Sequence, residues 1–192
     1  MRTALVIIVV AACSISAVAG DNPDCQVCID FSGTATSWSD VQSRIDPDLY
    51  EVFDAYVCVY GINAFAGICF AGYITPGMSA TTALTCLLPG CLTMGTWDEG
   101  IVLTSGDCHT ERFLYVAKLS LVYLDTPGDV MILDHPEWPR WTMDCPSPVE
   151  LDYYCVWMHG GVGKDALEGD EECFPVVPVE DATWGSVKAL YR

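Results

Sequence analysis

Two tryptophans and an arginine stand within four residues of one another, at Trp138, Arg140 and Trp141. Indole rings and a guanidinium stack well on sugar rings and on peptide groups, and aromatic and arginine side chains dominate many binding surfaces. Pro136 and Pro139 lie among them, so the segment is predicted to be a loop. These three residues are therefore the candidate binding surface, the alternative being that the indoles cap the core of the fold.

Cysteine is the second residue type that could do chemistry. The chain contains 11 cysteines, and one of them, Cys13, falls in the apolar N-terminal segment. The other ten are enough for five disulfides in an oxidising compartment; they are Cys25, Cys28, Cys58, Cys69, Cys86, Cys91, Cys108, Cys145, Cys155 and Cys173. Leu-Leu-Pro-Gly between Cys86 and Cys91 is a turn sequence and predicts a crosslink there. The other local pairs expected are Cys58 with Cys69 and Cys145 with Cys155.

The Cys25-Gln-Val-Cys28 motif has several functional readings, which its context disfavours. Ile29 follows it where a c-type haem site needs histidine. An alternating stretch follows instead of the helix that a redox motif would open, and a zinc site needs more ligands. Structural disulfides are therefore the favoured interpretation.

The motifs of common hydrolases are missing. The sequence has no G-x-S-x-G elbow and no H-E-x-x-H. The HGGVG stretch at 159–163 is predicted to be a flexible turn. The chain is therefore predicted to be a non-enzymatic extracellular structural or surface protein. The first alternative is a carbohydrate- or peptide-binding module that uses the Trp138 and Trp141 loop, and the second is a secreted hydrolase.

Calcium is the one cofactor for which the sequence offers candidate ligands. Asp170, Glu171 and Glu172 follow a glycine in an acidic loop, and carboxylate oxygens are the ligands that calcium prefers. The EF-hand pattern is absent, and the alternative is a solvated acidic loop.

The N-terminus has the pattern of an export signal. Arg2 precedes the apolar run 4–12, and small residues then lead to an Ala-x-Ala step at Ala17 and Ala19. Cleavage is expected after Ala19 or Gly20, and the run is too short to span a bilayer. Alternatively, Val-Ala-Ala-Cys resembles a lipobox that would make Cys13 a lipid anchor. Either way, the protein is expected to be secreted or held at the cell surface.

Acidic residues outnumber basic ones by 26 to 8, for a net charge of −18. Phosphate backbones and anionic lipids would be repelled, so nucleic-acid partners are not expected. A protein or a glycan at the cell surface is the expected partner.

The residues between these motifs read as strands. Phe53, Ala55, Val57 and Val59 alternate with more polar positions, and 112–125 alternates over a longer stretch. Further strands are expected within 64–74, 101–103, 130–134 and 151–158, and a short turn or helix between Ser39 and Asp46. Glycine and proline turns separate them. The fold class predicted is an all-β sandwich with disulfides.

The chain ends in TWGSVKALYR, where Trp184, Val187 and Leu190 recur at three-residue steps. A short C-terminal helix that docks on the sandwich is predicted, with an extended tail used for sorting as the alternative. The domain organisation expected is a signal at 1–19, the sandwich at 20–179 and the tail at 180–192.

The order of these features resembles a known group of proteins. A strand hairpin with glycines in its second arm, the strand ending TPGDVMILDHPE and the closing TWGSVKALYR are similar to uncharacterised secreted bacterial proteins. That resemblance implies an immunoglobulin-like or cohesin-like β-sandwich and an extracellular location. It implies no catalysis.

Overall fold

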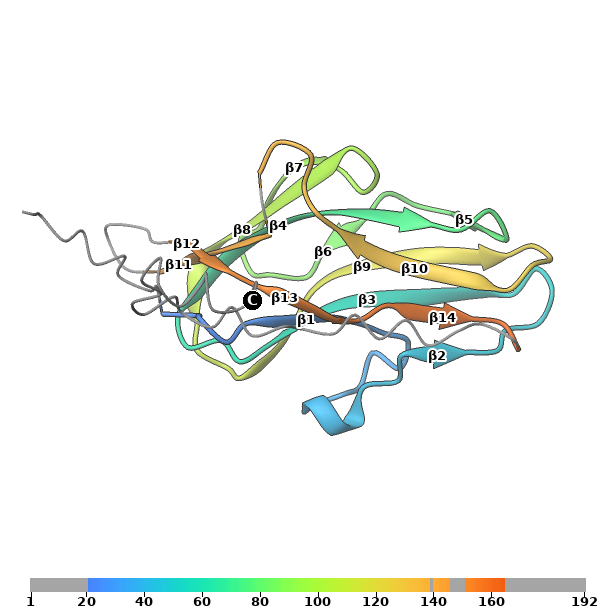
Figure 1. Cartoon of the computed structure of the whole chain (residues 1–192), viewed down its shortest axis with the longest axis horizontal. Coiled ribbons are helices and arrows are strands. Elements are labelled where there is room, and N and C mark those ends of the chain that lie inside the picture. Colours follow the sequence, from blue (N-terminus) through green and yellow to red (C-terminus); the bar gives the residue numbers. More distant parts are fainter. Residues whose placement is uncertain (1–20, 139, 146–150, 165–192) are drawn as a thin grey trace, which may run out of the picture.

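The computed structural model describes residues 21–138, 140–145 and 151–164, and it consists of two β-sheets packed face to face (Figure 1). The smaller sheet has six strands in the order β13-β1-β3-β9-β5, with β6 also paired to β9. Its strands are β1 (Gln26–Asp30), β3 (Val52–Tyr60), β5 (Met78–Ala80), β6 (Thr85–Cys86), β9 (Phe113–Tyr123) and β13 (Cys155–Met158).

The larger sheet has eight strands and is organised around β4 (Phe65–Ile74). Both β10 and β11 pair with β4, β8 also pairs with it, and β7 continues outward from β8. The other strands are β2 (Arg44–Ile45), β7 (Leu92–Thr96), β8 (Gly100–His109), β10 (Gly128–Leu133), β11 (Trp141–Asp144), β12 (Leu151–Tyr153) and β14 (Gly160–Val162). A 3-10 helix, Trp38–Asp40, overlaps the start of the Ser39–Asp46 segment for which a turn or helix is predicted, and β2 occupies Arg44–Ile45.

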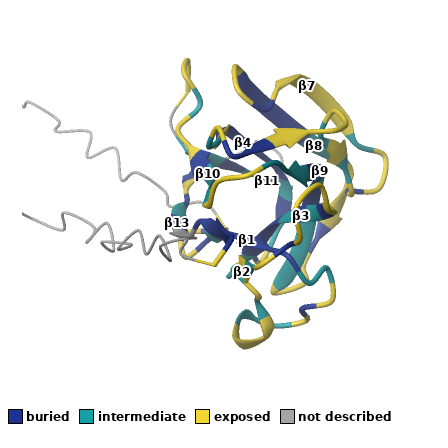
Figure 2. Ribbon diagram, turned by 90° about the vertical axis from the view of Figure 1, so that its right-hand side faces the viewer, coloured by how far each residue is buried: buried dark blue, intermediate teal, exposed yellow. Residues whose placement is uncertain are grey.

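Alternation along the strands builds the core between the sheets. Phe53, Ala55, Val57 and Val59 of β3 all point into the main hydrophobic cluster, as their spacing predicts. Figure 2 shows the buried strands lining the inside of the sandwich. The predicted all-β sandwich is confirmed. The predicted 101–103 strand is correct but is the start of a longer strand, β8.

Strand β9 departs from its predicted faces. Strict alternation would place Val116 opposite Ala117, yet both are fully buried in the core. The register explains this, since Val57 pairs with Ala117 and the next residue, Cys58, pairs with Tyr115. A β-bulge therefore inserts Val116 and exchanges the faces of β9 on its two sides.

The HGGVG stretch is a strand, and the prediction of a flexible turn is wrong. Gly160–Val162 forms β14, buried between β10 and β2. A Cβ atom on Gly160 would lie 2.5 Å from the Phe31 ring and 2.6 Å from an Ile29 methyl group. Glycine here permits close packing of the two sheets. A glycine-rich stretch is also typical of a loop, so the sequence pattern did not predict this strand.

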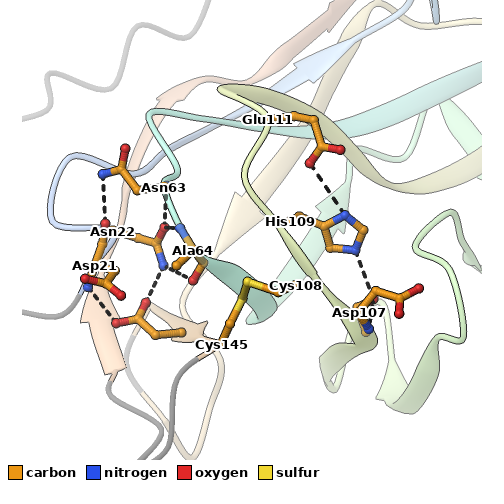
Figure 3. Close-up of a disulfide and its surroundings, with 11 residues drawn as sticks. Asp21, Asn22, Asn63, Ala64, Asp107, Cys108, His109, Glu111 and Cys145 are labelled. Atoms are coloured by element: carbon orange, nitrogen blue, oxygen red, sulfur yellow. Dashed lines mark hydrogen bonds and ion pairs between the residues drawn. A yellow bond between two sulfur atoms is a disulfide. The ribbon is translucent and has the colours of Figure 1, made fainter.

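The disulfides follow the predicted framework only in part. Cys86–Cys91 is present, as its turn predicted. Cys145 bonds Cys108 instead of Cys155 (Figure 3), and Cys155 is also disulfide-bonded. The Cys58–Cys69 pairing is wrong, because both residues are thiols, and Cys25 and Cys28 are thiols too, so the expected five disulfides are not all formed. Cys58 faces Cys28 across the β1–β3 pair and donates its thiol hydrogen to the Cys28 carbonyl oxygen at 3.3 Å.

Several predictions fall on residues outside the described ranges. These are the lipid anchor at Cys13, Cys173, the calcium ligands Asp170, Glu171 and Glu172, and the C-terminal tail. In the part of the chain that is described, no helix has the length and hydropathy needed to cross a bilayer.

We predict that the Cys108–Cys145 bond contributes more stability than Cys86–Cys91. The first closes a loop across 37 residues and the second across 5. Loop-closure entropy then gives about 4 kcal/mol for the longer loop and about 2 kcal/mol for the shorter one. Urea denaturation of the Cys108→Ser/Cys145→Ser and Cys86→Ser/Cys91→Ser variants measures the difference. A larger loss in the Cys86/Cys91 variant would contradict this ranking.

Candidate binding face

The outer surface of the larger sheet carries a row of apolar side chains that crosses four neighbouring strand pairs. Met94 of β7 pairs with Val102 of β8, and Val102 pairs with Cys69 of β4. Cys69 adjoins Trp141 of β11, since its thiol donates to the Trp141 carbonyl oxygen at 3.5 Å. Trp141 in turn pairs with Tyr153 of β12. Residues far apart in sequence are thus aligned by backbone pairing alone.

A second row runs beside the first, two residues further along each strand. Its members are Leu92, Thr104, Gly67, Met143 and Leu151, each paired with the next. Gly67 has no side chain, and a Cβ atom there would lie 3.2 Å from the Met143 Cε. We call the two rows together the apolar face.

The ends of the apolar face are exposed to solvent. Leu92 is 58% exposed, Met94 50%, Leu151 47% and Tyr153 50%. Antiparallel sheets that face water on one side normally carry polar residues there. Here Leu92 and Met94 are exposed at one end and Leu151 and Tyr153 at the other, while Val102 and Cys69 between them are buried. Exposed apolar patches rimmed by polar residues mark interaction sites, so each end is a candidate patch.

The loop between β10 and β11 adds Trp138 to this side of the molecule. Its base is closed by an ion pair between Arg140 and Asp134. His135 packs against Gly100 at the start of β8, where a Cβ atom would lie 2.7 Å from the imidazole Nε2. Trp138 stacks on His135 with ring centroids 4.8 Å apart and is 42% exposed.

The three residues predicted as a binding surface therefore have different environments. Trp138 is exposed on the loop, Arg140 is held by Asp134, and Trp141 is half-buried within the apolar face. The sequence-based prediction of a binding surface at these residues stays a prediction. It missed Leu92, Met94, Leu151 and Tyr153, because only strand pairing brings them next to Trp141.

The outer surface of the smaller sheet combines hydrogen-bonded polar groups with aromatic rings that pack on one another, such as Tyr56 and Phe113 on Tyr115. Asp54 on β3 accepts hydrogen bonds from Ser120 and from Lys118, whose ammonium lies 3.0 Å away. Burial acts to raise the pKa of Asp54, but the Ser120 and Lys118 contacts outweigh it and hold that pKa below its usual value. Asp30 is fully buried and accepts the Tyr115 hydroxyl at 2.6 Å. These groups satisfy one another, so the larger sheet is the better candidate for an interface.

A cavity of about 590 Å³ opens between the sheets near the β7–β8 turn. Ile74, Leu84, Ile101, Leu119 and Trp97 are among its lining residues, and most of them are apolar. The Trp97 Nε1 atom is buried without a hydrogen-bond partner in the described part of the chain. Polar side chains line the cavity as well, from Thr82, Thr93, Thr96 and Asp98.

A serine, a histidine and a glutamate meet at the end of β8. Ser105 Oγ lies 2.9 Å from His109 Nε2, and His109 Nδ1 lies 3.6 Å from Glu111 Oε2 (Figure 3). Ser105 Oγ also donates to the Pro89 carbonyl oxygen at 2.9 Å and accepts the Asp107 amide. A nucleophile needs a free hydroxyl beside a cleft. These contacts instead brace the strand end beside Cys108.

Metal ligands do not converge within 21–138, 140–145 or 151–164. No group of three or more histidine, cysteine, aspartate or glutamate side chains there has the geometry to hold an ion.

Comparison with known proteins gives similarities of architecture. No protein-family model and no curated protein matches the sequence. The seventh ScaB type I cohesin from Pseudobacteroides cellulosolvens is similar with a TM-score of 0.48 and 10% identity, over 77% of this chain and 98% of that chain. CaCohA2 from Clostridium acetobutylicum has a TM-score of 0.47 and 12% identity, over 77% of this chain and 96% of that chain.

We predict that the exposed ends of the apolar face are not needed for folding. Met94→Ala and Tyr153→Ala should each change the free energy of unfolding by no more than about 0.5 kcal/mol, because solvent already reaches these side chains. Val102→Ala, a truncation in the same row, should cost about 2 kcal/mol, because Val102 is only 6% exposed. Urea denaturation compares the three. A cost for Met94→Ala equal to that for Val102→Ala would show that the fold itself uses this side chain.

Proposed function

We propose that the chain is a non-catalytic, exported module that binds a protein partner on the apolar face. The observation that carries the proposal is the pair of aligned apolar rows, whose ends are about half exposed. An interface normally has an apolar centre and a polar rim. A rigid sheet is also preorganised, so little conformational entropy is lost when it binds.

Charge indicates the chemistry of the partner. Exposed carboxylates border the apolar face on the β7–β8 turn, on the end of β8 and on the 134–140 loop; they are Asp98, Glu99, Asp107, Asp134 and Glu137. The whole chain has a net charge of −18. A partner with an apolar centre and a basic rim would complement both features and would be steered to this face.

Two features support export of this module. The N-terminal pattern is that of a signal peptide. Disulfides such as Cys108–Cys145 persist in oxidising compartments and are rare in the cytosol.

We predict that a photo-crosslinking residue placed at Met94 captures a specific partner from the cells that make this protein. Once that partner is identified, Met94→Asp and Tyr153→Asp should each weaken its binding about tenfold or more, because a carboxylate would be buried in an apolar interface. Calorimetry with the purified partner measures the affinity.

Val52→Asp is the matched control, since Val52 is an exposed apolar residue, 61% exposed, on β3 of the smaller sheet. It should leave the affinity unchanged. Equal weakening by Val52→Asp, or the absence of any adduct at Met94, would refute the proposal.

Glycan binding is a second candidate function, favoured by the exposed indole of Trp138. One face of this ring stacks on His135, and the side chain is 42% exposed, which suits stacking on a sugar. We predict that any signal on a glycan array is lost in Trp138→Ala and retained in Met94→Asp. No signal from the unaltered protein, or a signal that survives Trp138→Ala, would remove this candidate.

A further inference from the structure

The first two described residues are held by an unusually complete set of contacts (Figure 3). The Asn22 side chain donates to the Ala64 carbonyl oxygen and to Asp144 Oδ1, and its own Oδ1 accepts the amides of Asn63 and Ala64. Asn63 in turn donates to the Asp21 carbonyl oxygen at 2.9 Å. Asn22 is fully buried, so the chain enters the fold here in one defined conformation.

Two buried carboxylates accept hydrogen bonds from the backbone amides of these two residues. The Asp21 nitrogen lies 2.6 Å from Asp144 Oδ2, and the Asn22 nitrogen lies 2.5 Å from Asp152 Oδ2. Asp144 is 1% exposed and Asp152 is 5% exposed. Asp144 is therefore aimed at the nitrogen that would be the α-amino group of a chain beginning at Asp21, and Asp152 holds the amide of the next residue.

The charge of Asp144 has no opposite charge beside it in the described part of the chain while Asp21 is an internal residue. Among the described residues, Asp144 contacts no lysine, arginine or histidine, and it accepts only the Asp21 amide and the Asn22 side chain. Burial, followed by the charge of Asp152, raises the pKa of the Asp144 carboxyl. Burial and these same two carboxylates raise the pKa of the Cys25 thiol. A buried anion without a cation is costly.

We propose that the exported protein is cut between Gly20 and Asp21, and that the new α-ammonium group of Asp21 is an ion-pair partner for Asp144. The proposal rests on the export part of the proposed function. A signal peptidase adds water across the Gly20–Asp21 peptide bond: Gly20 leaves as a carboxylate, and the Asp21 amine takes a proton. The amide donor seen at 2.6 Å from Asp144 thereby becomes a charged donor at the same place.

This assignment selects among the cleavage sites that the sequence leaves open. A cut after Ala19 would place Gly20 ahead of Asp21, and lipidation at Cys13 would place eight residues, 13–20, ahead of it. In both cases the Asp21 nitrogen would remain an uncharged amide beside Asp144. Only a cut after Gly20 converts the nitrogen that Asp144 already contacts into a charged group.

The first test is the N-terminal sequence of the protein recovered outside exporting cells. The expected first residue is Asp21, and exported protein that begins at any other residue would overturn the assignment. Protein that stays inside the cell with residues 1–20 attached would instead count against export. Failure to bind a partner by a protein that begins at Asp21 would count against the binding function alone.

The second test does not depend on export. A protease recognition sequence that ends at position 20 allows the folded chain to be cut in vitro, directly before Asp21. The cut should raise the melting temperature by about 2–4 °C, the shift that one surplus ion pair gives in a chain of this size. A matched chain whose cut leaves one additional glycine before Asp21 should show no rise. An equal rise in both chains, or a rise in neither, would overturn the proposal.

The pH dependence of the rise in melting temperature tests whether the charge of the Asp21 α-ammonium group causes it. Asp144, Asp152, the Asp21 side chain and the Cys25 thiol face this amine, and the carboxylates should raise its pKa above the ordinary 7.7–8.0. A raised amine pKa gives stability that is complete below about pH 7.7 and is lost as the pH rises through the folded-state pKa. The rise should therefore fade in alkaline buffer and be absent in Asp144→Asn. A rise that is independent of pH would refute the ion pair.

Discussion

The small residues of β4 are the constraint on which the rest of the structure depends. Gly72 leaves room on the inner side of the sheet for the Trp97 indole, with which any Cβ atom would collide. Its amide donates to the Trp97 carbonyl oxygen at 2.5 Å, so backbone and ring are fixed together. Trp97 then packs edge-on against Phe70. The turn between β7 and β8 is anchored in this way.

On the outer side, the same strand lets larger neighbours lie across it. Gly67 makes room for Met143, and the buried Cys69 and Ala71 leave the surface low between Met94 and Tyr153. A bulky residue at Gly67 would push Met143 away and break the second row. The apolar face therefore depends on the absence of bulky side chains from β4 as much as on the apolar side chains that are exposed.

The sequence predicted the sandwich because apolar residues alternate with more polar ones along strands such as β3, which places the apolar side chains on the inner face. Alternation in β3 and the Leu-Leu-Pro-Gly turn between Cys86 and Cys91 are local features, and both were correct. The failures come from long-range packing. The bulge that buries both Val116 and Ala117 depends on the partner strand. The glycines of β14 are required by Phe31 and Ile29, which lie more than a hundred residues earlier in the chain.

The candidate binding surface was predictable to the same limited extent. Trp138 and Trp141 could be singled out from the sequence because they are close together in it and because tryptophan is common on binding surfaces. Met94 and Tyr153 could not, since each is unremarkable until strand pairing aligns it with Trp141. The Cys108–Cys145 bond was missed for the same reason, because a nearer cysteine was available at Cys155.

The end of β11 joins three roles in consecutive residues. Met143 lies over Gly67 in the apolar face, Asp144 receives the Asp21 nitrogen, and Cys145 bonds Cys108 at the end of β8. Neighbouring residues on one strand cannot move independently, so displacement of one disturbs the other two. The disulfide therefore holds Asp144 at its buried position, and the contacts of Asp144 in turn hold the strand that carries Met143. The proposed N-terminus at Asp21 and the proposed binding face would therefore both depend on the position of this one strand end.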